Sequence, residues 1–479
     1  MSDYKQLGKN TVIFAIGSFS VKAIQFFLMP LITVSMTTDD YGMAESLMSL
    51  TELIIPLLTL GLQDAVFRFA MKKEVNQQSV LINTMIIVVA GAALVIIGAL
   101  IASVSVSLEV CLLFAALYIC VACSNVWGQF VRGTGKVATF AVSGIIQAII
   151  LAVSNAVFVY WLRWGANGYL LSLVASYLSS LTVLFFVGGV YKNLNPKAAD
   201  KALFKSMFRY ALPLMPTMIC WWFIQVVNRY IIIWFCGEGD AGLYVASSKI
   251  ATLINIFGTI FLQAWTISTV KSIDDRDKSS FNSNIFRYYS AFLHVATTGL
   301  LLILPFVSGF LLKGDFSDSW RYSSLAIFTA IISCYCSFFG AYYNAAMNTK
   351  MIFVSTLAGA LTNSVACLIL VPFTGIKGAL IASLTGYTIM TLIRVVDTRK
   401  YSEIKVNAIK EIIVLLLIAG QSVFILESAK ISSPYLYYGI QVAIVFAVAA
   451  LHFKDVIYLC SRIFSLIKNR RKGDCGTNE

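Results

Sequence analysis

The chain has 479 residues, of which 59% are hydrophobic and only 12% are charged, and its formal net charge is +13. Soluble domains carry about 25% charged residues, so this composition cannot supply the surface of a soluble protein. The sequence therefore predicts a polytopic membrane protein.

Windows of about 20 apolar residues recur along the whole chain, each long enough to cross a hydrocarbon layer about 30 Å thick. They predict an all-α fold of fourteen membrane-spanning helices. The first seven lie at residues 11–35, 42–70, 79–102, 109–131, 138–161, 168–190 and 206–236. The second seven lie at residues 241–270, 284–312, 321–346, 351–371, 377–396, 408–427 and 434–452.

Basic residues are distributed unevenly over the loops between these spans. With the N-terminus in the cytoplasm, about 28 of the 36 Lys and Arg residues fall in cytoplasmic segments, about 5 in exterior segments and about 3 within spans. Short cytoplasmic loops of membrane proteins accumulate Lys and Arg. Both termini are therefore predicted to be cytoplasmic. Topology and attraction to anionic lipids account for the net charge, so no nucleic-acid partner is expected.

Two segments that start 200 residues apart share a pattern: DDYGMAESLMSLTELIIPLLTLGLQDA begins at Asp39, and GDAGLYVASSKIATLINIFGTIFLQAW begins at Gly239. The clearest matched positions are Asp40 and Asp240, Gly42 and Gly242, Thr59 and Thr259, and Gln63 and Gln263. Duplicated bundles are common in secondary transporters. The repeat predicts an N-terminal lobe (1–205), a C-terminal lobe (206–398) and an appendix (399–479) with two helices and a basic cytoplasmic tail. Six spans in each lobe suit a cavity between two lobes.

The segment NTVIFAIGSFSVKAIQFFLMPLITVSMTTDDYG, followed by LTLGLQDAVFRFAMKK, resembles the N-terminal pattern of bacterial polysaccharide flippases. These are the O-antigen and capsule repeat-unit exporters of the multidrug/oligosaccharidyl-lipid/polysaccharide (MOP) superfamily. The resemblance implies a fourteen-helix fold with two lobes that open a central cavity alternately to each face. It also implies an oligosaccharide cargo on a polyprenyl diphosphate, moved from the cytoplasmic to the outer leaflet of the bacterial cytoplasmic membrane. Membrane lipids are then partners, and a polysaccharide polymerase and other assembly proteins remain open as partners.

Polar side chains form a stripe on three predicted helices, at spacings of three and four residues. A lysine at the centre of a bilayer is unfavourable by about 2.5–3.5 kcal/mol, so these stripes should face protein or water rather than lipid. The first stripe contains Thr11, Ser18, Lys22 and Gln25; the second contains Glu45, Ser49, Glu52, Pro56, Thr59 and Gln63; the eighth helix has Lys249, Thr252, Thr259 and Gln263. The polar face recurs in both repeats while its charge differs, because Lys249 stands where the first repeat has Ser49.

A diphosphate requires cations that offer several donors, and arginine and lysine supply them as a planar fork and a point charge. The candidates for binding the headgroup are Lys22, Arg229 and Lys249, and those for binding sugars are Gln25, Gln63, Gln225 and Gln263. Glu52 is a candidate counter-ion to Lys22 or a site for a proton or sodium ion. The alternative is that these charges pair with one another and only hold the lobes together.

Asp64 and Arg68 lie one helical turn apart near the cytoplasmic end of the second predicted helix, where side chains at i and i+4 can meet. Two interpretations remain open. They form a structural clasp at the cytoplasmic rim, or they are a gate that pairs in one state and separates in the other.

The chain has only two histidines, His294 and His452. Their distance in sequence argues against a histidine-based metal site. No metal or organic cofactor is expected, and coupling to protons or Na⁺ is left open. The aromatic run from Tyr335 to Tyr343 is interpreted as core packing, with stacking on sugar rings as the alternative.

Two rival functions are weighed against the flippase. A cation-coupled multidrug antiporter of the same fold would use acidic sites for cationic cargo and rely less on cations within the membrane. A polysaccharide polymerase or ligase would need a large exterior catalytic loop, and no predicted exterior loop is long enough. The sequence favours a transporter rather than an enzyme and leaves the sugar, the coupling ion and the oligomeric state open.

Overall fold

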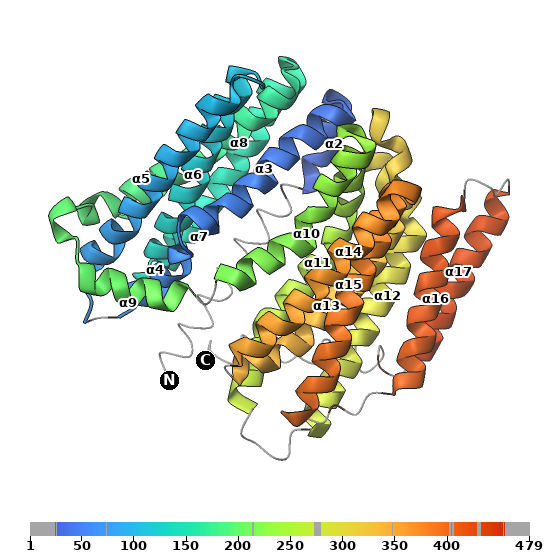
Figure 1. Ribbon diagram of the computed structural model, residues 1–479. Helices are drawn as coiled ribbons and strands as arrows, with labels where there is room; N and C mark the ends of the chain where they lie inside the picture. Colours follow the sequence, from blue (N-terminus) through green and yellow to red (C-terminus); the bar gives the residue numbers. More distant parts are fainter. Residues whose placement is uncertain are drawn as a thin grey trace, which may run out of the picture. The chain divides into compact units, whose positions relative to one another are not determined.

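The computed structural model describes residues 24, 26–72, 74–212, 215–272, 279–346, 348–401, 404, 407–428, 433–453 and 455. Every regular element in these residues is helical, which confirms the all-α prediction (Figure 1). The helices of the first half are α2 (Met29–Ser35), α3 (Thr38–Leu58), α4 (Leu62–Ala70), α5 (Gln77–Ala102), α6 (Leu108–Gly133), α7 (Val137–Asn155), α8 (Gly165–Phe186), α9 (Lys201–Ala211) and α10 (Met215–Cys236). Those of the second half are α11 (Glu238–Ser272), α12 (Ser279–Leu311), α13 (Trp320–Ala345), α14 (Thr349–Thr374), α15 (Ile376–Asp397), α16 (Ala408–Leu426) and α17 (Pro434–Leu451).

Within the described residues, 11 helices are long and apolar enough to cross a membrane, or 12 if the bent α10 is counted as one span. The chain is thus a multi-pass membrane protein. The predicted count of fourteen is not confirmed, in part because most of the first predicted span lies outside the described residues.

Two predicted spans are not continuous helices. The span predicted at 42–70 is divided into α3 and α4 because Leu60 and Gly61 adopt left-handed φ values of 53° and 67° after Pro56. The span predicted at 206–236 includes the end of α9, a separate amphipathic helix that packs against α4 and α5, so the apolar helix begins only at Met215. Asp200 caps α9 by accepting from the amides of Ala202 and Leu203.

Contacts between Cα atoms divide the chain into two compact units. Unit 1 comprises Met1–Ala246, Phe310–Ser317 and Ala360–Ser383. Unit 2 comprises Ser247–Gly309, Asp318–Gly359 and Leu384–Glu479. The lobes 1–205 and 206–398 and the appendix 399–479 follow from the repeat rather than from contacts, and they remain a prediction.

In unit 1, helices α5 to α8 pack side by side as neighbours in the chain, and α3 packs against α6, α8 and α10 (Figure 1). The start of α3 also meets the start of α11 at Gly42 and Gly242, two positions matched in the repeat. A Cβ on Gly42 would overlap the carbonyl oxygen of Glu238, and a Cβ on Gly242 would overlap that of Thr38. Contact between two matched positions of a repeat is expected where the two repeats are related locally by a pseudo-two-fold axis.

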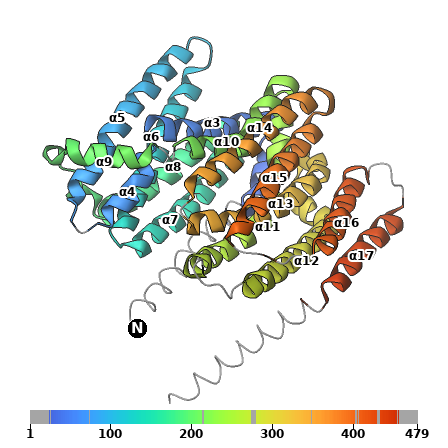
Figure 2. The same cartoon turned by 60° about the horizontal axis from the view of Figure 1, so that its bottom comes forward.

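In unit 2, α13 is the most buried of the candidate spans. It packs against α16, and α16 packs against α17 (Figures 1 and 2). The aromatic run on α13 is buried: Phe338 stacks on Trp265 with ring centroids 4.6 Å apart, and Phe286 lies 5.2 Å from Tyr335. The packing interpretation of this run is confirmed.

Candidate functional site

Arg229, on α10, lies against α3 within unit 1. Its Nη2 atom is 3.5 Å from Glu45 Oε2, and both side chains are only 11% exposed. Its Nη1 atom donates to the backbone carbonyl of Glu45 and to the hydroxyl of Ser49. Glu45 and Ser49 are one turn apart on α3, so one guanidinium reaches both. In this conformation Arg229 is therefore ion-paired with an acid of the α3 stripe.

Two tyrosine hydroxyls complete the surroundings of Glu45. Tyr41 donates to Glu45 Oε1 at 3.2 Å, and Tyr169 of α8 donates to the same oxygen at 3.0 Å. One carboxylate oxygen thus accepts two hydroxyls while the other faces the guanidinium. Hydrogen bonds to the remaining donors and acceptors stabilise a buried ion pair. Glu45 and Arg229 Nη1 have such bonds, whereas Arg229 Nε is buried without a hydrogen-bond partner among the described residues.

Two aromatic residues fix α10 to the backbone of α3. The indole nitrogen of Trp222 donates to the carbonyl of Ser49 at 2.7 Å. The hydroxyl of Tyr230 donates to the carbonyl of Ser46. The position of Arg229 is therefore set by contacts before and after it on the same helix, which limits the freedom of its long side chain. We call Arg229, Glu45, Ser49, Tyr41 and Tyr169 the arginine cluster.

The residue before Arg229 points into a second polar cluster. Asn228 is fully buried, and its Nδ2 lies within hydrogen-bonding distance of three acceptors: Asn363 Oδ1 at 3.1 Å, the carbonyl of Ala379 at 3.0 Å and Ser383 Oγ at 2.8 Å. Asn363 returns a hydrogen bond of 2.9 Å to Asn228 Oδ1. Helix α10 therefore carries a charged contact on one face and a neutral amide contact with α14 and α15 on the adjacent face.

Several predicted binding residues are placed only in part. Lys22 and Gln25 lie outside the described residues, as do the side chains of Gln225 on α10 and Gln263 on α11. Gln63, near the start of α4, is half-buried, and its Oε1 atom is buried without a hydrogen-bond partner among the described residues. Lys249, on α11, is half-buried and belongs to unit 2, whereas Arg229 belongs to unit 1.

The predicted coupling and gate residues are placed as follows. Glu52 lies on α3 with an exposed side chain. Asp64 lies on α4, and its side chain is outside the described residues. Arg68 is exposed, and its guanidinium carbon lies 4.8 Å from the ring centre of Tyr210 on α9. The clasp and the gate both remain predictions, and Arg68 has an aromatic contact that neither interpretation included.

Sequence reasoning missed two groupings. It placed Glu45 in a polar stripe but did not pair it with Arg229 or with Tyr169. It also treated His294 and His452 as remote, and this was wrong, because His294 Nδ1 lies 3.0 Å from His452 Nε2 in unit 2. The available signal was that both histidines fall in or beside apolar spans, where ionisable side chains require partners. Within the described part of the chain, no three His, Cys, Asp or Glu side chains form a metal site.

Residues 7–267 match the family model described as polysaccharide biosynthesis protein. No curated protein matches the chain. Among solved structures, the chain is similar to an inward-facing multidrug resistance MATE family transporter of the MOP superfamily, with a TM-score of 0.67 and 14% identity over 88% of this chain and 100% of that one.

Two further solved structures share the fold. The lipid II flippase MurJ, in an inward closed conformation, has a TM-score of 0.63 and 16% identity over 93% of this chain and 100% of its own. A MOP superfamily transporter from Pyrococcus furiosus has a TM-score of 0.58 and 15% identity over 82% of this chain and 95% of its own. At these identities the likeness establishes a shared fold.

Proposed function

Because this chain belongs to the polysaccharide biosynthesis protein family, we propose that it is a lipid-linked oligosaccharide flippase. It moves repeat units on polyprenyl diphosphate from the cytoplasmic to the outer leaflet by alternating access, for surface polysaccharide such as O-antigen or capsule. The family match over more than half of the chain carries this proposal. The MOP fold, shared with a lipid II flippase, supports it.

Arg229 is the described residue best suited to meet a diphosphate. Its guanidinium is held in the membrane-spanning part of α10 by Glu45, a single carboxylate. A diphosphate offers more charge and more acceptor oxygens than a carboxylate, and arginine binds such groups through a planar fork. In our proposal the cargo competes with Glu45 for Arg229, so the ion pair belongs to the unloaded site. Lys22 and Lys249 add headgroup contacts, and Gln25, Gln63, Gln225 and Gln263 contact the sugars.

Glu52 and the pair Asp64 and Arg68 are assigned to coupling and gating in the same proposal. Glu52 is exposed on the same helix as Glu45. In our proposal this carboxylate exchanges a proton or sodium ion in the state in which it faces water. Asp64 and Arg68 would pair in one state of the transport cycle only.

The multidrug antiporter is the second candidate because MATE transporters share the fold. Cationic cargo requires an acid with a free negative charge. Glu45 is the buried acid in the described part of α3, and Arg229 already neutralises it. In this conformation Glu45 therefore offers cationic cargo no uncompensated negative charge. Among the connections at the predicted exterior ends, residues 312–319 form one of the longest, which is too short for the catalytic domain of a polymerase or ligase.

Reconstituted vesicles test the flippase directly. The full chain is placed in liposomes with a fluorescent polyprenyl-diphosphate oligosaccharide, and a membrane-impermeant quencher reports how much probe reaches the outer leaflet. We expect wild-type protein to flip the probe and Arg229→Ala to be slower by about 10–100-fold, as expected for losing a charge-assisted contact. The matched control is Arg209→Ala, on the exposed face of α9.

Three outcomes would contradict the proposal. Wild-type protein that does not flip the probe but transports a cationic dye against an ion gradient would establish the antiporter. Unchanged flipping by Arg229→Ala would remove Arg229 from the binding site. Equal losses in Arg229→Ala and Arg209→Ala would show a general effect of removing basic residues.

A further inference from the structure

A second buried cluster lies in unit 2, where four helices bring ionisable groups together. His294 is on α12, Tyr335 is on α13, Glu411 is on α16, and His452 and Asp455 follow α17. Both histidines are fully buried, and Tyr335 and Asp455 are 5% and 7% exposed. We call these five residues the histidine chain. None of them has a role in the flippase mechanism proposed above.

The histidine chain is a continuous series of contacts. Tyr335 Oη is 2.9 Å from Glu411 Oε2 and 2.8 Å from His294 Nε2. His294 Nδ1 is 3.0 Å from His452 Nε2. His452 Nδ1 is 3.5 Å from Asp455 Oδ2. Each imidazole therefore uses both nitrogens in the chain.

The number of protons limits how many of these contacts can be hydrogen bonds. Four contacts of 3.5 Å or less join the five residues in series, and each hydrogen bond requires one proton. His294 Nε2 also lies 3.7 Å from Glu411 Oε2, which is too long for a hydrogen bond. With both carboxylates ionised and both imidazoles neutral, the tyrosine and the two histidines supply one proton each. Three protons leave one contact with two facing acceptors. The two facing acceptors are His452 Nδ1 and Asp455 Oδ2, which make the longest of the four contacts. His452 Nδ1 is buried without a hydrogen-bond partner among the described residues.

Charged groups around the histidine chain determine which of its residues holds a fourth proton. Asp455 Oδ2 accepts from Lys410 of α16 at 2.9 Å, and Arg287 of α12 lies 3.0 Å from Asp455 Oδ1, so this carboxylate already has two cationic partners. His452 is fully buried, and burial disfavours a charged imidazolium. The hydrogen bonds described for Glu411 come from the neutral hydroxyls of Tyr335 and Ser290. The fourth proton therefore belongs on Glu411.

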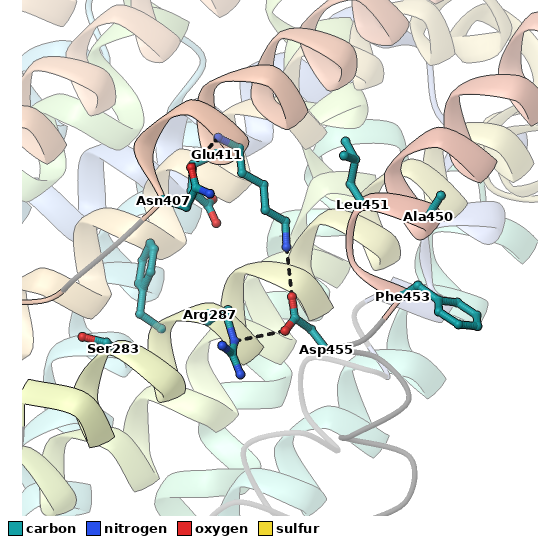
Figure 3. A pocket seen from close by; sticks show the side chains of 10 residues that line it. Ser283, Arg287, Asn407, Glu411, Ala450, Leu451, Phe453 and Asp455 are labelled. Atoms are coloured by element: carbon teal, nitrogen blue, oxygen red, sulfur yellow. Dashed lines mark hydrogen bonds and ion pairs between the residues drawn. The ribbon is translucent and has the colours of Figure 1, made fainter.

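A pocket adjoins both ends of the histidine chain. A cavity of about 620 Å³ is lined by Glu411 and Asp455, the two ends of the histidine chain, together with Arg287, Lys410 and Asn407. Figure 3 shows Asp455 in this pocket, with its ion pair to Arg287. A proton can therefore enter or leave the histidine chain at Asp455, from the pocket.

We propose that the histidine chain is a binding site for one proton, which enters at Asp455 from the pocket, is relayed through both histidines and Tyr335, and leaves Glu411 protonated. In the loaded site Glu411 donates to Tyr335, Tyr335 donates to His294 Nε2, His294 Nδ1–H donates to His452, and His452 Nδ1–H donates to Asp455. For release, one proton moves along each hydrogen bond from Glu411 toward Asp455, and Asp455 gives the surplus proton to the pocket. The three hydrogen bonds between Glu411 and His452 then run in the opposite direction, the hydrogen bond between His452 and Asp455 is lost, and both histidines carry their proton on Nε2. Binding and release conserve charge and need no other reactant. Proton uptake thus ties the end of α17 to α12 and α13.

The presence of only two histidines makes the test direct. Full-length protein with ¹⁵N-labelled histidine in lipid nanodiscs is followed by NMR from about pH 5 to about pH 9, where histidines and perturbed carboxyl groups titrate. Imidazole ¹⁵N shifts distinguish protonated from unprotonated nitrogens. We expect both rings to change from Nε2–H to Nδ1–H at one common pH as the pH falls. Independent titration of the rings, a doubly protonated ring in this step, or no change across the range would overturn the proposal.

Two variants and one control sharpen this test. In Glu411→Gln the amide donates permanently to Tyr335, so both rings should remain Nδ1–H at every pH. In Tyr335→Phe the chain is interrupted, so the rings should no longer respond to Glu411. The control is Glu427→Gln at the other end of α16, about 24 Å along the helix, which should keep the switch. A persistent switch in Glu411→Gln would overturn the proposal, and if that variant does not fold, Tyr335→Phe and the wild type still decide.

A link between this site and the transport cycle rests on the proposed function. We expect flipping of the fluorescent probe to depend on pH in the wild type and to lose that dependence in Glu411→Gln. A tautomer switch without flipping by the wild type would leave the proton site intact and refute the flippase. Flipping with the same pH dependence in both proteins would refute the link.

Discussion

The arginine cluster of unit 1 and the histidine chain of unit 2 both bury ionisable groups, and they differ in how these groups are satisfied. In the arginine cluster, Glu45 has two hydroxyl donors and a guanidinium, and the charges of Arg229 and Glu45 cancel. In the histidine chain, three available protons face four contacts. In the first arrangement permanent charges balance each other, although Arg229 Nε has no hydrogen-bond partner among the described residues. In the second, the fourth contact becomes a hydrogen bond only after a proton is bound.

This difference separates two uses of buried polarity. Arginine stays charged at every physiological pH, so Arg229 can change its partner but not its charge. That property suits the recognition of an anionic headgroup. Histidine and carboxyl groups change protonation within the physiological range when their surroundings require it. That property suits a response to pH or to a proton gradient.

The largest expected effect comes from removing one member of the buried ion pair. Glu45→Ala leaves the guanidinium of Arg229 buried without its counter-charge, which should lower the free energy of unfolding by about 3–5 kcal/mol. Unfolding in mixed micelles would measure this. The double variant Glu45→Ala with Arg229→Met should recover much of the loss, because no unpaired charge remains.

A double-mutant cycle provides the control for this prediction. If the effects of Glu45→Ala and Arg229→Met simply add, the two side chains do not interact, and the contrast with the histidine chain fails. A loss below about 1 kcal/mol for Glu45→Ala, the size of an exposed pair, would show that water reaches this cluster.

A smaller effect is expected where the repeat partners meet beside the arginine cluster. Gly42 precedes Glu45 by about one turn, and a Cβ at position 42 would overlap the carbonyl oxygen of Glu238. Gly42→Ala should therefore displace α3 and lower the free energy of unfolding by about 1–3 kcal/mol. The matched control is Gly98→Ala within α5, where no atom lies within 4 Å of an added Cβ. The control should be neutral or stabilising by about 0.5–1 kcal/mol. Equal effects at both positions would rule out close packing at Gly42.

The sequence predicted the elements much better than the contacts between them. Apolar length alone located the spans, because a bilayer requires about 20 apolar residues for each crossing. It did not reveal the break at Leu60 and Gly61, since apolar length is insensitive to a left-handed φ at two residues. The repeat singled out Gly42 and Gly242, although their contact became clear only in three dimensions.

The sequence predicted which helix face the site residues occupy but not which side chains they contact. The helical spacing placed Glu45 and Ser49 on one stripe, as the structure has them, because a period of 3.6 residues fixes direction around a helix. Which side chain meets the stripe depends on how distant helices pack, so the contact between Glu45 and Arg229 was missed. The contact between His294 and His452 was missed for the same reason. Their separation in sequence was the reason for predicting that the two histidines form no joint site. Helices that are far apart in sequence can nevertheless pack side by side.

The smallest effect on stability is expected for replacement of Arg287, which contacts Asp455 at one end of the histidine chain. This replacement distinguishes the effect of charge on the proton site from the effect of packing. Arg287 is 51% exposed, and Asp455 keeps Lys410 when Arg287 is replaced. Arg287→Gln should therefore lower the free energy of unfolding by only about 0–1 kcal/mol. It should nevertheless move the histidine tautomer switch to higher pH, because removing a positive charge favours proton binding nearby. Arg321→Gln, about 21 Å along α13 from Tyr335, should leave the switch in place. A shift to lower pH in Arg287→Gln would contradict the proton site, whereas a large loss of stability would mean that unit 2 depends on its ion pairs as strongly as unit 1 does.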